Sequence, residues 1–265
     1  MAEYDIVHVA VAPPDTLEEG LARTVAGIID KDLYGTRLLL AGKVPRIVAH
    51  YKTVPEAESI AQSLRALGLV AIVCNDSELR NISAVRFMAH TLEPGGGEII
   101  FRDKAGRVKK VKAEDVFLIL SGTRQTHAEK KAAKTKIKLN VPATLLTGGI
   151  PIWRKTKEEI KDMSVKTEGF VRLYDRTSSE PCVEILQYDF DYSFLAAKSA
   201  PSSFTNLNAV ITELRNTFTQ AVFDDRLMQS YGADVSADAA GSKAEINCKL
   251  VCLYHKVLSG HSPLR

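Results

Sequence analysis

A chain of 265 residues is long enough for two domains and for a sizeable hydrophobic core. Its 45% apolar and 25% charged residues exclude a disordered or membrane-spanning class, and the net charge of +3 is small. The longest apolar runs are too short to cross a bilayer, and acidic residues stand at the N-terminus where a secretory signal would be basic. We therefore expect a cytoplasmic protein without a membrane span.

The first 41 residues predict a strand, a helix and one ambiguous run. Tyr4–Ala12 alternates like a strand and ends at two prolines. Asp15 or Thr16 can cap a helix that runs to Asp30 with apolar residues on one face. Thr36–Ala41 is either a buried strand or a short helix, because periodicity cannot distinguish the two in so short a run.

Two apolar runs flank an amphipathic helix between Arg46 and Asp76, which predicts a βαβ or split βαβ unit. The unit has no glycine-rich phosphate loop. If Thr36–Ala41 is a strand, the order from residue 4 to residue 76 is βαββαβ, which resembles the ferredoxin-like domain. We expect residues 1–86 to form this α/β domain.

The chain after the turn at Pro94–Gly97 has the pattern of antiparallel strands. Glu98–Lys112 predicts a hairpin, and Asp115–Leu120 predicts a third strand that completes a meander. The elements expected further on are a second hairpin at 170–175 and 182–188, a helix from Ser202 or Ser203 to about Phe218, a polar link at 233–242 and a final helix at 245–258.

The phrases GEIIFRDKAGRVKKV, DVFLIL, and FVRLYD with VEILQY precede the predicted helix at 203–218. This order resembles the pleckstrin-homology-like barrel, over roughly residues 87–220. The resemblance implies a strongly bent antiparallel sheet that is plugged by a C-terminal helix. An insert at about 124–168 departs from the compact family pattern, and residues 221–265 form a C-terminal extension. The expected fold class is thus α+β, a ferredoxin-like domain followed by an antiparallel barrel-like domain with a capping helix.

Basic residues gather in the middle of the chain, where twelve Lys and Arg stand against four Asp and Glu between residues 102 and 138. In the barrels that the sequence resembles, the loop between the first two strands binds anionic head groups. The resemblance therefore implies an anion site in the hairpin, with the candidates Arg102, Lys104, Arg107 and Lys109. The alternative is a solvated charged face that protects an edge strand from aggregation.

The lysines at 130–138 extend the positive field toward Trp153 and raise the alternative of a nucleic-acid surface. Aromatic residues for base stacking are missing between residues 124 and 140, which argues against it.

Three further groups of residues carry possible chemistry. His50, Cys74 and Asp76 follow or end two predicted strands and could meet as a thiol nucleophile with its base. Cys248, Cys252 and His255 share one helical face and offer soft ligands, but no fourth ligand is evident and core packing is the alternative for the cysteines. The third group comprises the acidic residues Asp189, Asp191, Asp224 and Asp225, for which turn and cap roles compete with cation binding.

We expect a non-enzymatic module that binds a small molecule or a protein, or that acts as a scaffold, without a metal or cofactor. The competing functions are anion, lipid head-group or nucleic-acid binding through residues 102–138, and an enzyme at His50 and Cys74. The four cysteines lack the spacing of a disulfide framework and are expected to be reduced thiols. The partner and the oligomeric state are left open.

Overall fold

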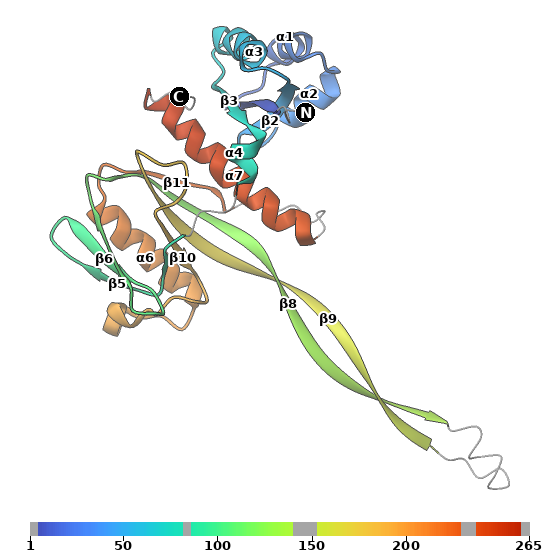
Figure 1. Cartoon of the computed structure of the whole chain (residues 1–265), viewed down its shortest axis with the longest axis vertical. Helices are drawn as coiled ribbons and strands as arrows, with labels where there is room; N and C mark the ends of the chain where they lie inside the picture. Colours follow the sequence, from blue (N-terminus) through green and yellow to red (C-terminus); the bar gives the residue numbers. More distant parts are fainter. Residues whose placement is uncertain (1–4, 82–85, 140–152, 229–236, 261–265) are drawn as a thin grey trace. The chain divides into compact units, whose positions relative to one another are not determined.

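The computed structural model describes the backbone of residues 5–81, 86–139, 153–228 and 237–260. This part of the chain is mixed α and β, as expected, and none of its three sheets closes into a barrel (Figure 1). Residues 1–124 and 168–265 form one compact unit, and residues 125–167 form another. The second unit occupies the positions at which the sequence predicts an insert.

The N-terminal elements are β1 (Val7–Val11), α1 (Glu19–Ile29), α2 (Leu33–Leu40), β2 (Arg46–Tyr51), α3 (Val54–Ala66), β3 (Ala71–Asn75) and α4 (Asp76–Arg80). The sheet order is β2-β1-β3, and β1 runs antiparallel to both neighbours. The unit β2–α3–β3 therefore has its two strands separated by β1, which is the split arrangement. Strand β2 is one edge of this sheet.

Strand β1 is buried on both faces, so its alternate residues belong to two cores. Val7, Val9 and Val11 pack with the apolar faces of α1 and α3. Ala10 packs on the opposite face with residues of α4 and α7 (Ala237–Leu258), among them Leu79 and Leu250. His8 has the same parity as Ala10 and therefore points to this second face.

One expectation for the N-terminal part is corrected, and one open alternative is decided. Helix α1 begins at Glu19, not after Asp15 or Thr16, because Leu17 already packs against the core from the segment that precedes the helix. Residues 36–40 belong to helix α2, which starts where the Asp32 carboxylate accepts a hydrogen bond from the Gly35 N–H at 2.7 Å. The condition for the βαββαβ order is therefore not met, because the second strand of that order is a helix.

The elements that follow residue 86 are β4 (Met88–Ala89), β5 (Thr91–Pro94), β6 (Glu98–Arg102), β7 (Val108–Lys112), β8 (Val116–Leu139), β9 (Trp153–Asp175), β10 (Val183–Leu186), the 3₁₀ helix η1 (Ser193–Lys198), α6 (Ser203–Thr217), β11 (Val222–Leu227) and α7. One sheet has the order β5-β6-β7 and the other has the order β11-β8-β9-β10-β4. Both predicted hairpins are confirmed, by the antiparallel pairs β6–β7 and β9–β10.

The predicted meander is wrong, because β8 does not pair with β7 but enters the five-stranded sheet between β9 and β11. Residues Val116 and Ile119 of β8 share a core with Ile99 and Phe101 of β6, so the two sheets meet through side chains and not through a hydrogen-bond ladder. Helix α6 fills this core with one apolar face that includes Leu207, Val210 and Leu214. As predicted, the helix is capped at Ser202, whose side chain accepts from the Thr205 N–H.

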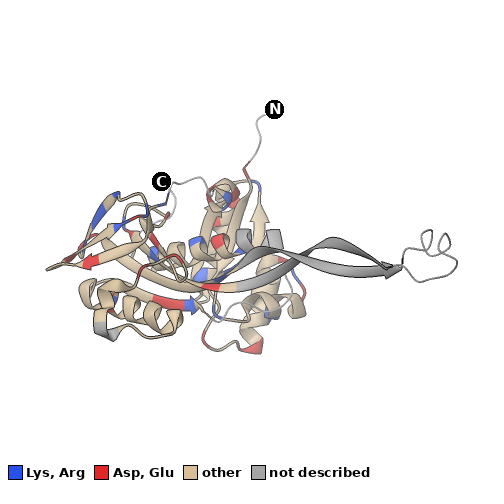
Figure 2. Ribbon diagram, turned by 90° about the horizontal axis from the view of Figure 1, so that it is seen from below, with Lys and Arg blue, Asp and Glu red and all other residues tan. Residues whose placement is uncertain are grey.

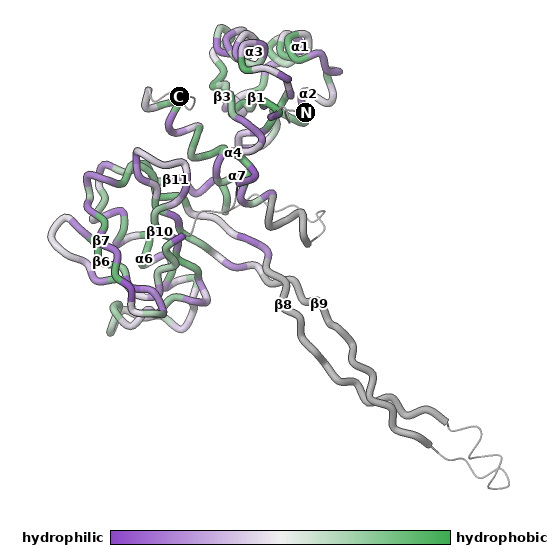
Figure 3. Tube along the Cα trace, in the orientation of Figure 1, coloured by the Kyte–Doolittle hydropathy of each residue, from purple (hydrophilic) through white to green (hydrophobic). Residues whose placement is uncertain are grey.

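Helix α7 is longer than predicted and packs against two of the three sheets. Cys248, Val251 and Cys252 contact the core of the five-stranded sheet, whereas Leu250 and Leu253 contact the N-terminal sheet β2-β1-β3. Figure 3 shows apolar and hydrophilic residues interleaved along the helix. Residues 237–242, which the sequence assigns to a flexible link, belong to α7, and positions 233–236 lie outside the described residues. Local polarity failed as a signal because a helix of this length is stabilised by the packing of its later turns.

Candidate functional site

His8 lies at the centre of a chain of three polar side chains on one face of the N-terminal sheet, β2-β1-β3. Its Cα partners are His50 on β2 and Cys74 on β3. The two histidine Nδ1 atoms are 2.7 Å apart, and His8 Nε2 lies 2.9 Å from Asp76 Oδ1. We call Asp76, His8 and His50 the histidine relay. It links a buried imidazole, only 4% exposed, to a carboxylate on one side and to an exposed imidazole on the other.

Asp76 is held at the start of α4 by its own backbone N–H, which donates to Ile6 O at 2.8 Å. The Arg80 Nε donates to Asp76 Oδ1 at 2.7 Å. The hydrogen bond from Arg80, followed by that from His8, lowers the pKa of Asp76, although burial opposes the change. The carboxyl group is therefore ionised near neutral pH and can only accept hydrogen bonds.

His50 forms the outer end of the relay, and its ring meets that of His8 edge to face, with centroids 4.8 Å apart. Partial burial, together with the charges of His8 and Lys31, lowers the pKa of His50 below its usual value of 6.5. Near neutral pH the neutral ring therefore predominates. Its Nε2 makes no hydrogen bond with any residue in the described ranges.

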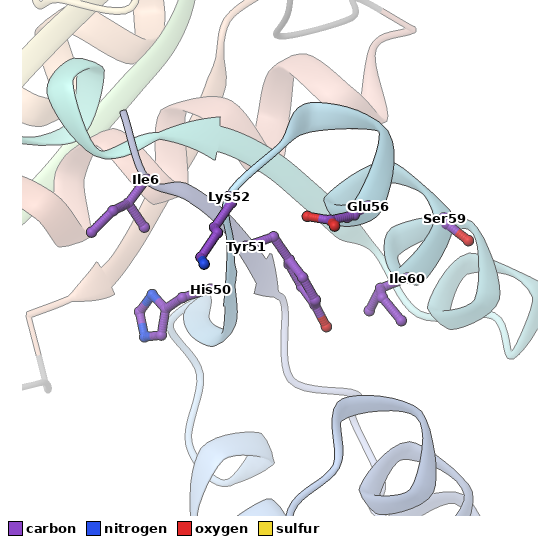
Figure 4. Close-up of a pocket in the computed structure, with 7 residues that line it drawn as sticks. All are labelled: Ile6, His50, Tyr51, Lys52, Glu56, Ser59 and Ile60. Carbon is purple, nitrogen blue, oxygen red and sulfur yellow. The ribbon is translucent and has the colours of Figure 1, made fainter. Parts of the chain in front are cut away.

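A pocket of about 740 Å³ opens beside His50 at the edge of the sheet, where β2 leads into α3. Figure 4 shows the seven residues that line it, with His50 and Lys52 near Ile6, and Tyr51, Glu56, Ser59 and Ile60 along the other side. The wall thus combines apolar surface with a cation, an imidazole, a hydroxyl and a carboxylate. Lys52 forms no ion pair within the described part of the chain.

Cys74 takes no part in the hydrogen bonds of the relay. Its side chain is 1% exposed and packs with Ala10, Ile72 and Leu79. Burial raises the pKa of the Cys74 thiol to about 12. The reactive form of cysteine is the thiolate, so this environment suits a small core residue and not a nucleophile. Of the three residues predicted to meet, His50 and Asp76 are connected, and the connection is His8.

The four candidate cations of the basic hairpin all have acceptors of their own. Arg102 pairs with Glu93 at 3.2 Å, Lys104 with Asp189 at 3.1 Å and Arg107 with Asp103 at 2.5 Å, and Lys109 donates to Cys182 O at 2.9 Å. Figure 2 shows basic and acidic residues mixed over the described part of the chain. The four side chains do not converge on one point, as a phosphate site would require.

The predicted metal candidates are separated by their partners. Cys248 and Cys252 are buried in the core on the five-stranded sheet, and burial raises the pKa of each thiol to about 12. His255 Nε2 lies 2.6 Å from Asp224 Oδ2, which also pairs with Arg226. Within the described residues, no group of three or more His, Cys, Asp or Glu side chains could hold a metal ion. Asp191 accepts from the N–H and the hydroxyl of Ser193, which is a turn role.

Sequence reasoning missed a buried ionic network that joins the five-stranded sheet to α7. Three cations and three acids form it, namely Arg86, Arg172, Lys249, Glu180, Glu184 and Glu245. Lys249 also donates to Glu78 O and Asn81 O, at the end of α4. The available signal was a charge inside an apolar strand run, as in FVRLYD and VEIL. His8 carries the same signal, a polar residue in the middle of VHVAV.

No known family model matches the chain, and the comparisons with curated proteins and with solved structures likewise yield no match. None of the helices in the described ranges combines the length and the apolar character that crossing a bilayer requires. The function must therefore be inferred from the residues and the geometry of the site itself.

Proposed function

We propose that the protein is a ligand-binding module and that its pocket beside His50 takes a small molecule with an anionic group next to an apolar part. The observation that carries the proposal is that the histidine relay ends at the wall of this pocket. The buried imidazole of His8, paired with the half-buried carboxylate of Asp76, fixes the orientation of His50 and so prepares one polar group for a ligand. Oriented polar groups in a largely apolar cleft are the usual composition of a small-molecule site.

The charges in the pocket favour an anion. Lys52 contributes a cation without a competing ion pair among the described residues, whereas His50, whose pKa is lowered by partial burial, adds a positive charge only at acid pH. Glu56 is the one acid among the residues that line the pocket, and it would repel an anion. The anionic group should therefore lie nearer to Lys52 than to Glu56, which favours a small ligand. Ile6, Tyr51 and Ile60 supply the surface for an apolar part, and 49% of Ile6 is exposed.

The other functions expected from the sequence have less support. The hairpin cations are engaged by Glu93, Asp103, Asp189 and the Cys182 carbonyl, which leaves a diffuse field as the basis for lipid or nucleic-acid binding. A Cys–His enzyme lacks an accessible thiol. We retain a protein partner as the alternative occupant of the pocket, and a non-enzymatic role as part of the proposal.

The resemblances also remain proposals. The split β2–α3–β3 unit supports the ferredoxin-like assignment for the first domain, although helix α2 replaces one of the four strands of that fold. The packing of α6 on the antiparallel sheet β5-β6-β7 supports the pleckstrin-homology-like assignment. Both types of domain recur as binding units. Four free cysteines support a cytoplasmic location.

The test is a ligand titration of the ¹⁵N-labelled full chain with phenyl phosphate, benzoate and benzyl alcohol. We expect the two anions to shift the amide signals of residues 50–60, and the neutral alcohol to bind at least about tenfold more weakly. Lys52→Met should weaken the binding of both anions, whereas Lys110→Met, an exposed lysine on β7, should not. Equal affinities for all three compounds, or equal effects of the two substitutions, contradict the proposal.

A further inference from the structure

We propose that His50 Nε2 is a phosphoryl acceptor, so that the pocket is a site of histidine phosphorylation by an acyl phosphate or phosphoramidate donor. The inference rests on the proposed function, because it needs the pocket to admit a phosphate. It goes beyond it by assigning a nucleophile. Its basis is the order of the three side chains, in which His50 stands where a nucleophile stands relative to a base, His8, and an orienting acid, Asp76.

The hydrogen bonds of the relay fix the tautomer of His50. Asp76 is ionised and can only accept, so His8 must present Nε2–H to it. A neutral His8 then has its lone pair on Nδ1, and the 2.7 Å contact requires His50 to donate from its own Nδ1–H. His50 Nε2 is left with a lone pair, on an exposed ring that lines the pocket. The atom without a partner in the described structure is thus the nucleophilic one.

The same relay can take up the charge that the reaction creates. When the Nε2 lone pair attacks the phosphorus of an acyl phosphate, a P–N bond forms and the P–O bond to the acyl group breaks. The carboxylate leaves with the electron pair. With phosphoramidate, which carries its proton on nitrogen, the P–N bond of the donor breaks instead and ammonia leaves with the electron pair. The imidazole of His50 becomes cationic, and its Nδ1 proton can pass to His8 Nδ1, 2.7 Å away. The resulting imidazolium of His8 is stabilised by Asp76, at 2.9 Å.

The pocket wall supplies a cation for the phosphoryl oxygens. Lys52 carries the positive charge that a phosphate needs, and Figure 4 shows it beside His50, on the same side of the pocket. The other histidines with described side chains lack this combination. His255 is buried against Asp224, and His90 is a half-buried residue whose Nδ1 lies 2.5 Å from the Asp189 carbonyl oxygen. His90 is therefore a suitable internal reference for the reactivity of an ordinary histidine.

The experiment treats the full chain with phosphoramidate and, separately, with acetyl phosphate, and follows the labelling of each histidine by peptide mass spectrometry under alkaline conditions. We expect His50 to be labelled at least about tenfold faster than His90, at Nε2 as read by ³¹P and ¹⁵N NMR. His50→Gln should abolish this fast phase, and His90→Gln should leave it unchanged. A His50 rate no higher than that of His90, or labelling at Nδ1, overturns the proposal.

Variants of His8 and Asp76 test whether these two residues orient the His50 ring for the reaction or only stabilise the fold around it. His8→Asn frees Nδ1 of His50, so the product should shift from Nε2 toward a mixture of both nitrogens. Asp76→Asn, the variant that disturbs the core less, should slow the fast phase while circular dichroism stays native. Unchanged rate and regiochemistry in both variants also overturn the proposal. Phenyl phosphate binding is measured on each protein, so a pocket that binds the anion without being labelled refutes only this inference.

Discussion

Arg172 and Glu245 form a bidentate ion pair in which Nη1 lies 2.9 Å from Oε2 and Nη2 lies 2.5 Å from Oε1. The arginine belongs to β9 and is 2% exposed, and the glutamate belongs to α7. Arg86 binds the same carboxylate, at 3.0 and 2.6 Å. Glu245 is therefore shared by two guanidinium groups, which Glu184 also contacts, and it ties α7 to the five-stranded sheet.

Glu245→Gln should destabilise the protein by up to about 3 kcal/mol, because the substitution removes the carboxylate that Arg86 and Arg172 share and leaves them only Glu180 and Glu184 as counter-charges. Urea unfolding followed by circular dichroism measures the loss. The matched control is Glu19→Gln, which removes an exposed ion pair with Arg23 and should cost much less. Similar costs for the two variants would show that the buried network adds no more than a surface pair.

The same carboxylate should make stability depend on acid pH. Burial works to raise the pKa of Glu245, but hydrogen bonds from Arg86 and Arg172 outweigh it and lower the pKa from 4.5 to about 2. A depressed pKa means that the stabilising contribution is complete above pH 4.5 and is lost as the pH falls toward 2. Unfolding free energies measured across this range should fall more steeply for the wild type than for Glu245→Gln. Parallel pH profiles would contradict the prediction.

Gly122→Ala should destabilise by about 1 to 3 kcal/mol through overpacking between β8, β9 and β11. A Cβ atom at this position would lie 2.6 Å from Phe170 Cζ and 2.8 Å from Leu227 Cβ. Gly27→Ala is the opposite case, because a Cβ there meets nothing within 4 Å and the residue lies inside α1. Gly27→Ala should stabilise the protein by about 0.5 to 1 kcal/mol. Thermal melting of both variants tests whether the melting temperature falls for Gly122→Ala and rises for Gly27→Ala.

Cys74 should be inert in the folded protein. Its burial and a thiol pKa of about 12 leave almost no accessible thiolate at pH 8. Iodoacetamide labelling with peptide mapping should detect Cys74 only after unfolding, and Cys74→Ala should retain phenyl phosphate binding. Rapid alkylation of the native thiol, or loss of binding in the variant, would restore the Cys–His hypothesis.

The basic hairpin should bind polyanions weakly and without a specific site. Arg107→Ala and Lys109→Ala should each change the affinity for a short single-stranded oligonucleotide by no more than about twofold, like Lys134→Ala and Lys136→Ala. Fluorescence anisotropy over a salt series measures this. Salt-resistant binding that Arg107→Ala removes would instead reveal the anion site that the pleckstrin-homology-like resemblance implies.

Elements whose signals are local could be predicted. Helix α6 has a serine cap followed by an apolar stripe, and the pairs β6–β7 and β9–β10 each have a turn between short apolar runs. Residues 36–41 stayed undecided between strand and helix because the decisive signal, the Asp32 cap of α2, lies before the apolar run. The prediction of a meander was wrong because no signal in the neighbouring residues indicates which sheet β8 joins. Pairing between strands is decided by cores that form only when distant segments meet.

The sequence by itself determined the α+β class, the two hairpins, the capped helix and the choice of His50 and Asp76 as residues that could act together. It could do so because helix caps, turns and strand alternation depend on neighbouring residues. Only the tertiary structure decided which side chains of the site are hydrogen-bonded to one another, since the antiparallel register of β1 places His8 between β2 and β3 and leaves Cys74 in the core. The same holds for Arg172 and Glu245, which are 73 residues apart. A buried charge stands out in the sequence, but its partner becomes known only from the packing of the chain.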